Sequence, residues 1–148
     1  MDETMKEQVK KKQKDGWIEA QFTFEVMAAS PEIADTSLKN HVERLGRAPD
    51  TFVYDKSFSN AEKVANPPAG LKEAHSQIGK AKLFAKDFYT MLNIIMVYGP
   101  SAIEILSPNK RELKIDEMQN IANVVGGLMH EFAAKGVGAM LISSPTKQ

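Results

Sequence analysis

Hydrophobic and polar residues alternate with a period of two in two stretches of the chain, Ile18 to Val26 and Ile78 to Lys86. In the first stretch every second residue is apolar: Ile18, Ala20, Phe22, Phe24 and Val26. In the second, one set alternates with another: Ala81, Leu83 and Ala85 against Lys80, Lys82 and Phe84. Such a period puts alternate side chains on opposite faces of a strand. The pattern therefore predicts two strands, each with one face on a core.

Each alternating stretch leads into a helical pattern. Ser30 is a suitable N-cap with Pro31 at the first helical position, and Asp87 is predicted to cap the second helix. Apolar residues then recur at three- and four-residue spacings: Ala34, Leu38, Val42 and Leu45 in the first helix; Phe88, Met91, Leu92, Ile95 and Met96 in the second. Gly46 with Pro49, and Gly99 with Pro100, are predicted to end these helices, with Gly46 in the left-handed conformation.

Two further strands complete the pattern. One runs from Thr51 to about Asn60, with an unclear face assignment because Phe52 and Phe58 share a parity that Val53 does not. After a loop rich in proline and glycine and the second strand–helix unit, Ala102 to Leu106 is a short strand with Ile103 and Ile105 inward and Glu104 outward.

The order of elements predicts an α+β fold, a ferredoxin-like βαββαβ sandwich with both helices on one face of an antiparallel sheet. The two alternating strands then lie side by side in the centre of the sheet. Glu19 and Glu25 share the outer face with Lys80 and Lys82, where opposite charges on neighbouring strands keep that face polar.

An additional C-terminal amphipathic helix is predicted after residue 115. Asp116 as N-cap with Gln119 forms a variant capping box. The apolar face comprises Met118, Ile121, Ala122, Val125, Met129 and Phe132. At Gly126-Gly127 either the helix bends or another backbone approaches closely, and both readings stay open. Beyond it, Val137 to Ile142 forms an edge strand or packs as a tail.

The first 15 residues are a charged, lysine-rich arm ended by Gly16, and residues 16–148 are predicted to form a single α+β domain. The chain of 148 residues is 43% hydrophobic and 26% charged, which is ordinary for a soluble globular protein. Its net charge of zero gives no reason to expect nucleic acid or a membrane as partner. Without cysteine, secretory signal or spanning segment, we expect a cytoplasmic protein.

No motif for catalysis, cofactor binding or metal binding stands out. RNA-recognition modules of this topology display aromatic side chains on the central strands. Here the outward positions are Glu19, Gln21, Thr23, Glu25, Lys80 and Lys82, with only Phe84 aromatic. The three histidines, His41, His75 and His130, fall in separate elements. We therefore predict no catalytic, cofactor or metal residue. Catalytic groups that converge only in space leave no motif in the sequence, so an enzyme stays an open alternative on that ground alone.

The segment Tyr98 to Pro108 (sequence YGPSAIEILSP) resembles a segment of small uncharacterised archaeal proteins. Those proteins also look like strand–helix–strand units followed by an amphipathic helix. The resemblance covers about Ile78 to Lys135. It carries no assigned activity, so no functional residue is transferred.

The surplus of apolar surface near the C-terminus favours a non-enzymatic, self-associating module, with a closed homodimer as the expected assembly. The predicted self-association residues are Gly126, Gly127, Met129, Phe132, Val137, Met140 and Leu141. The alternatives are a small-molecule effector-binding domain and, more weakly, nucleic-acid binding through the lysine-rich arm.

Overall fold

The computed structural model describes residues 1–135. Its elements are α1 (Glu3–Lys14), β1 (Ile18–Ala28), α2 (Pro31–Gly46), β2 (Thr51–Phe58), β3 (Glu62–Lys63), β4 (His75–Ala85), α3 (Phe88–Tyr98), β5 (Ala102–Ser107) and α4 (Ile115–Ala134). The chain divides into two compact units, Met1–Arg111 and Glu112–Gln148. This division falls inside the single domain predicted for residues 16–148.

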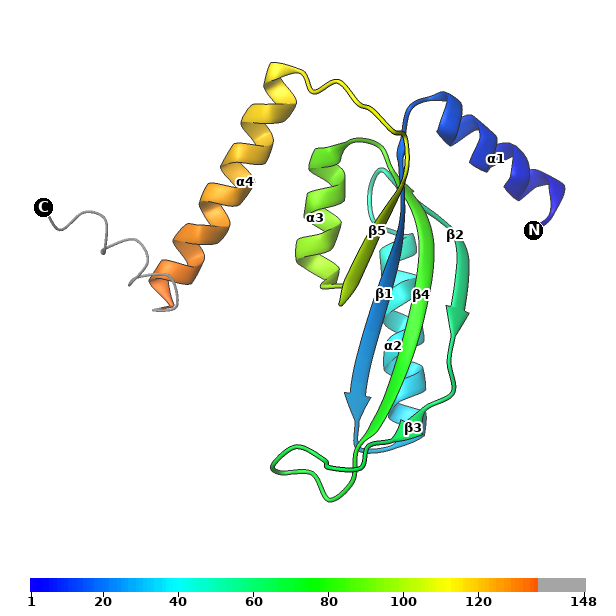
Figure 1. The fold of residues 1–148 in the computed structure, drawn as a ribbon, viewed down its shortest axis with the longest axis vertical. Coiled ribbons are helices and arrows are strands. Elements are labelled where there is room, and N and C mark those ends of the chain that lie inside the picture. Colours follow the sequence, from blue (N-terminus) through cyan, green and yellow to red (C-terminus); the bar gives the residue numbers. More distant parts are fainter. Residues whose placement is uncertain (136–148) are drawn as a thin grey trace, which may run out of the picture. The chain divides into compact units, whose positions relative to one another are not determined.

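The first unit contains an antiparallel sheet with the strand order β2-β4-β1-β5, and the short β3 extends the pairing along β4. The two central strands, β1 and β4, lie side by side as predicted (Figure 1). Phe22 is paired with Ala81 and Ala20 with Leu83. The fold is therefore mixed α+β, built on strands whose alternation is visible in the sequence.

Glu19 and Glu25 share the outer face of the sheet with Lys80 and Lys82 as predicted, but neither glutamate lies directly opposite a lysine. Lys82 lies opposite Gln21 on β1 and opposite Asp55 on β2, while Glu25 lies opposite Ile78. Glu19 lies opposite the aromatic Phe84.

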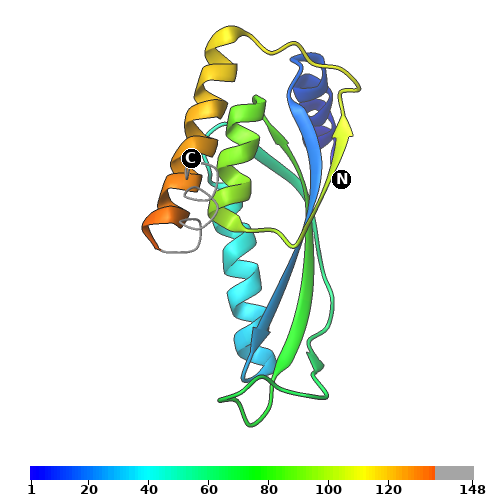
Figure 2. The same ribbon diagram turned by 60° about the vertical axis from the view of Figure 1, so that its left-hand side comes forward.

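Helices α2 and α3 both cover the inner face of the sheet (Figure 2). The core between the layers is apolar throughout and is formed by Ile18, Ala20, Phe22, Phe24, Leu38, Val42, Leu45, Ala81, Leu83, Ala85, Met91 and Ile94. Burial of this many side chains, at about 1.5–3 kcal/mol for each large one, is what fixes the helices on the sheet.

Helix α2 begins as its sequence predicts and ends differently. The Ser30 hydroxyl accepts a hydrogen bond from the Ile33 N–H at 3.2 Å, and Pro31 is the first helical residue. All four predicted apolar positions are fully buried. Gly46, however, is the last helical residue, and Arg47 with φ −101° follows it as C-cap. The expected left-handed glycine is therefore wrong here, because 3₁₀-type hydrogen bonds close the last turn, from Arg47 to Arg44 and from Ala48 to Leu45.

Helix α3 is capped at both ends as predicted, but its buried face is rotated. Asp87 accepts from the Thr90 N–H at 2.8 Å, and Gly99 takes the left-handed conformation at φ 57°. The fully buried residues are Met91 and Ile94. Of the other predicted positions, Phe88, Leu92 and Ile95 are half-buried and Met96 is exposed. The helix is apolar almost all round, so its sequence alone could not fix which side meets the sheet.

A β-bulge at Tyr54 explains the unclear faces of β2. Phe52 lies opposite Phe84 on the outer face and Val53 opposite Leu83 on the inner face. The register then shifts, so that Asp55 lies opposite Lys82. One extra residue reverses the alternation, and Phe58 reaches the inner face opposite Gly79 although it shares the parity of Phe52.

Strand β5 forms an edge of the sheet. Ile103 lies opposite Phe22 and Ile105 opposite Ala20, so both face the inner side as predicted. Even so, Ile103 is 42% and Ile105 49% exposed. The core therefore stops short of this strand.

Helix α4, in the second unit, runs without interruption through Gly126-Gly127 (Figure 1). Within the described residues, a Cβ added to either glycine would meet nothing within 4 Å, so no backbone of this part of the chain approaches closely. The predicted capping box is wrong. The helix begins at Ile115 after Lys114, without a side-chain cap, because Asp116 turns its carboxylate to the neighbouring Glu117 N–H at 2.9 Å.

Candidate functional site

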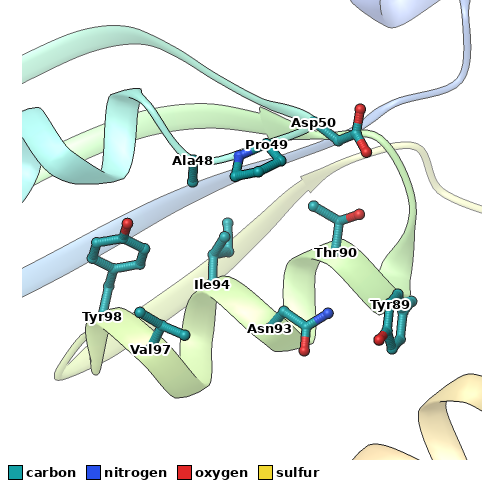
Figure 3. A pocket seen from close by; sticks show the side chains of 9 residues that line it. All are labelled: Ala48, Pro49, Asp50, Tyr89, Thr90, Asn93, Ile94, Val97 and Tyr98. Carbon is teal, nitrogen blue, oxygen red and sulfur yellow. The ribbon is translucent and has the colours of Figure 1, made fainter.

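A pocket of about 320 Å³ lies on the helix layer of the first unit (Figure 3). It is formed by the segment between α2 and β2 on one side and by α3 on the other, and its lining residues are Ala48, Pro49, Asp50, Tyr89, Thr90, Asn93, Ile94, Val97 and Tyr98. Figure 3 shows Ile94, Thr90 and Tyr98 extending from α3 toward Ala48 and Pro49. Its volume is at the lower end of the range for small-molecule sites.

The wall opposite α3 is fixed by backbone contacts. Asp50 has φ 54°, a left-handed conformation that Asp adopts more readily than most residues. Its carbonyl accepts a hydrogen bond from the Lys86 N–H at 3.0 Å, one residue before the cap of α3. The turn before β2 is thus attached to the start of the helix that forms the other wall.

Tyr98 is fixed at the other end of the pocket. Its hydroxyl donates to the Arg44 carbonyl at 3.2 Å, and its own carbonyl accepts from Nε2 of His41 at 2.7 Å. The His41 ring makes edge contacts with Tyr98 and Phe24. This histidine therefore has a structural role, joining α2, α3 and β1. The pocket it supports is apolar around Ile94 and carries hydrogen-bonding groups at Thr90 and Asn93.

A polar cluster lies on the outer face of the sheet, around Glu19. The Glu19 side chain is only 9% exposed. Its carboxylate accepts hydrogen bonds from the Tyr54 hydroxyl, from Oγ of Ser107 at 2.9 Å and from Nε2 of Gln13 at 3.4 Å. Residues of β1, β2, β5 and α1 therefore meet at one carboxylate.

Burial and the neighbouring Glu19 carboxylate raise the pKa of Tyr54 above its ordinary value of 10.0. The Tyr54 ring packs against the fully buried Phe84 at 5.3 Å between centroids. With three donors already on the carboxylate, the cluster ties elements together rather than presenting a charge to a ligand. The alternation predicts Glu19 on the outer face, where it lies, but not its burial there, because the bulge that turns Tyr54 toward it has no signature in the alternation.

Helix α1 is attached beside this cluster. The Lys12 Nζ lies 3.7 Å from the centroid of the Trp17 ring and 5.8 Å from that of Phe52. One lysine of the predicted arm is thus used in a cation–π contact, and Lys6 pairs with Glu3 at 3.4 Å.

The predicted self-association residues fall into three groups. Met129 and Phe132 lie on the apolar side of α4 and are 37% and 41% exposed. At about 100° per residue, Gly126 borders that side, whereas Gly127 lies on the opposite side with Asn123. Val137, Met140 and Leu141 lie outside the described residues, as does the whole predicted run Val137 to Ile142.

Within residues 1–135, no group of three or more His, Asp or Glu side chains is placed to hold a metal ion. No helix in the same residues combines the length and apolar character that crossing a membrane requires.

Comparison with known proteins gives a family. No curated protein matches the chain significantly. The model of the MJ0538 family, whose name is of archaeal type, matches residues 19–145. The match supports the resemblance to small archaeal proteins and extends it from the second strand–helix unit to the first. It covers most of the described sheet, both of its helices and α4. The chain therefore belongs to the MJ0538 family.

Proposed function

We propose that this chain is a homo-oligomeric interaction module in which a second copy covers the apolar side of α4. The observation that carries the proposal is that α4, a helix of 20 fully described residues, buries none of them. Met118, Val125, Met129 and Phe132 share one side and are 37% to 49% exposed. An isolated helix is marginal in water, and its stability normally comes from packing of such a side.

A second copy is a suitable partner because the surface is self-complementary. The apolar side continues from Met118 to Phe132, so an antiparallel pair related by a twofold axis would place it against itself around Val125. Burying each large side chain contributes about 1.5–3 kcal/mol, and each residue is buried twice in such a dimer.

Charges at the ends of α4 support the antiparallel arrangement. Glu117 and Lys135 are about five helical turns apart and so lie on one line along the helix. An antiparallel pair places Glu117 of each copy on the same edge of the interface as Lys135 of the other. The opposed helix dipoles favour the same arrangement.

Light scattering after size exclusion tests the proposal on the full chain. We expect a homo-oligomer at micromolar concentration and a smaller species for Val125→Asp. Asn123→Asp is the matched control, since it adds the same charge to the other side of the same helix and should leave the oligomer intact. A monomeric full chain, or a Val125→Asp variant of the same oligomeric size as the full chain, would contradict the proposal.

We also infer that the first unit has the ferredoxin-like βαββαβ architecture. Support comes from the order β2-β4-β1-β5, from the antiparallel neighbours and from α2 and α3 on one face. Helix α1 and the two-residue β3 are additions to that pattern. An experimental structure with a different strand order would overturn this assignment.

The pocket beside α3 favours a second candidate function, the binding of a small effector. Its apolar wall and the hydrogen-bonding groups of Thr90 and Asn93 suit a ligand with an apolar body and a polar end. A metabolite at 100 times its Kd should add about 2.7 kcal/mol of stability in a thermal-shift screen. Asn93→Leu should weaken that effect, and Thr23→Val on the other face of the sheet should not. A screen without any shift counts against this candidate.

A further inference from the structure

The two edges of the sheet differ in how they are protected against pairing with another strand. At the β2 edge the ladder is broken by the bulge at Tyr54, and the exposed charges Asp55 and Lys56 follow it. Bulges and charges of this kind are what natural proteins place on edge strands to prevent association. The β2 edge is therefore blocked.

The β5 edge lacks most of these features. Among the described strands its only neighbour is β1, and the register is regular from Ala102 to Ile105. The strand contains no proline or lysine, and its one charge, Glu104, belongs to the outer face. On the inner face, Ile103 and Ile105 are both more than two-fifths exposed. This strand presents an open ladder together with apolar side chains that the core does not cover.

We propose that β5 pairs with β5 of a second copy, antiparallel about a twofold axis, so that one sheet continues through both copies. This interface is separate from the α4 surface and does not rest on the function proposed above. A second copy fits because, in an antiparallel pair related by a twofold axis, each strand offers the other the same backbone donors and acceptors. The same axis places the inner faces of the two sheets on one side.

Charge and regularity select the register. In a twofold antiparallel pair, directly opposed residues lie on the same face of the sheet. The axis therefore passes midway between the two copies of one residue, which oppose each other. If that residue were Glu104, two carboxylates would be directly opposed, which is destabilising. If it were Ile105, the pairing would meet the irregularity at Leu106, which has no partner on β1. With the axis at Ile103, Glu104 faces the small Ala102 of the second copy and the two Ile103 side chains are in contact.

This register makes a sharp cross-linking test, because the chain has no cysteine. Directly opposed residues in an antiparallel pair have Cα atoms about 4.5–5.5 Å apart, within the range that a disulfide can bridge. Ile103→Cys in the full chain should therefore form a covalent dimer under mild oxidation. Ile105→Cys is the matched control: it lies on the same face with similar exposure, but its two copies would be about 13 Å apart along the strands.

Two further variants separate this interface from α4 and from failure to fold. The cysteine variants are compared with and without Val125→Asp, which disables the α4 surface, and the cross-link at residue 103 should persist. An equimolar mixture of Ala102→Cys and Glu104→Cys, both at exposed positions, should give a mixed covalent dimer in excess of either homodimer. Equal yields at residues 103, 105 and the β2-edge control Ser57→Cys, or no cross-link in any variant and in the mixture, would overturn the proposal.

Discussion

At Gly79, the sheet and the helix layer meet without room for a side chain. A Cβ at this position would lie 3.1 Å from Cδ2 of Leu38 and 3.1 Å from the ring carbon Cδ1 of Phe58. Leu38 is fully buried in the core, so it has little space into which to move. Gly79→Ala should therefore lower the free energy of unfolding by about 1–3 kcal/mol, as overpacked substitutions do.

Urea unfolding measures this change. Gly126→Ala is the control, since nothing in the described residues lies within 4 Å of its added Cβ. Alanine is about 1 kcal/mol more favourable than glycine inside a helix, so that substitution should not destabilise the protein. A Gly79→Ala variant as stable as the wild type would show that the β4–α2 contact is looser than its distances indicate.

Tyr54 gives the protein a specific sensitivity to alkali. Burial, and then the Glu19 carboxylate, raise its pKa in the folded state above the ordinary 10.0. Below pH 10 both states keep the phenol protonated, so this group adds no pH dependence. As the pH rises above 10, the unfolded state loses the proton first, and stability falls.

The difference between the wild type and Tyr54→Phe isolates the contribution of this one phenol to the pH dependence. The wild type should lose stability more steeply above pH 10 than the variant. In absorbance titrations, one of the three tyrosines should ionise only on unfolding. Parallel pH profiles for the two proteins would contradict the assignment.

At the scale of elements, the helix starts show how a local signal can succeed or fail. Ser30 and Asp87 both accept the predicted N-cap hydrogen bonds. Asp116 has the right residue type for an N-cap, yet α4 begins two residues earlier than it would with this cap, after Lys114. Side-chain caps are short-range interactions, so sequence finds them well where a strand leads directly into the helix, as before α2 and α3, and less well after an irregular segment, as before α4.

Ser30→Ala should cost about 1 kcal/mol of stability, because the Ile33 N–H then loses its partner at the start of α2. Ser30→Asp should retain the stability, since Asp is an equally good N-cap. Thermal unfolding followed by circular dichroism distinguishes the two variants. Equal losses for both would indicate that the position matters for another reason.

The strands show what alternation cannot predict. The pattern placed β1 and β4 correctly, because both are long and have one continuous apolar face. In β2, the bulge at Tyr54 puts Phe52 and Phe58 on opposite faces, and this depends on pairing with β4 rather than on local propensity. The same bulge brings Tyr54 to Glu19, so the buried cluster was invisible for the same reason.

At the scale of the whole molecule, the core lies entirely within the first unit. Its buried residues run from Ile18 to Ile94, well before the boundary at Arg111. A fragment of residues 1–111 should therefore fold on its own, with a cooperative thermal transition close to that of the full chain. It should also lose the part of the self-association that depends on α4.

Circular dichroism and light scattering on the fragment test both statements. The full chain measured under the same conditions is the reference. A fragment that is unfolded, or that melts without cooperativity, would show that α4 contributes to the core of the first unit.

The sequence by itself determined the local structure of this protein: two alternating strands, the N-caps of α2 and α3, the end of α3 at Gly99 and the amphipathic character of α4. These follow from side-chain period and from capping chemistry, which act over a few residues. Only the tertiary structure decided the buried face of α3, the reversed alternation in β2, the burial of Glu19 and the exposure of Ile103 and Ile105. Each of these depends on which distant segment lies alongside, and such pairings have no period along the chain.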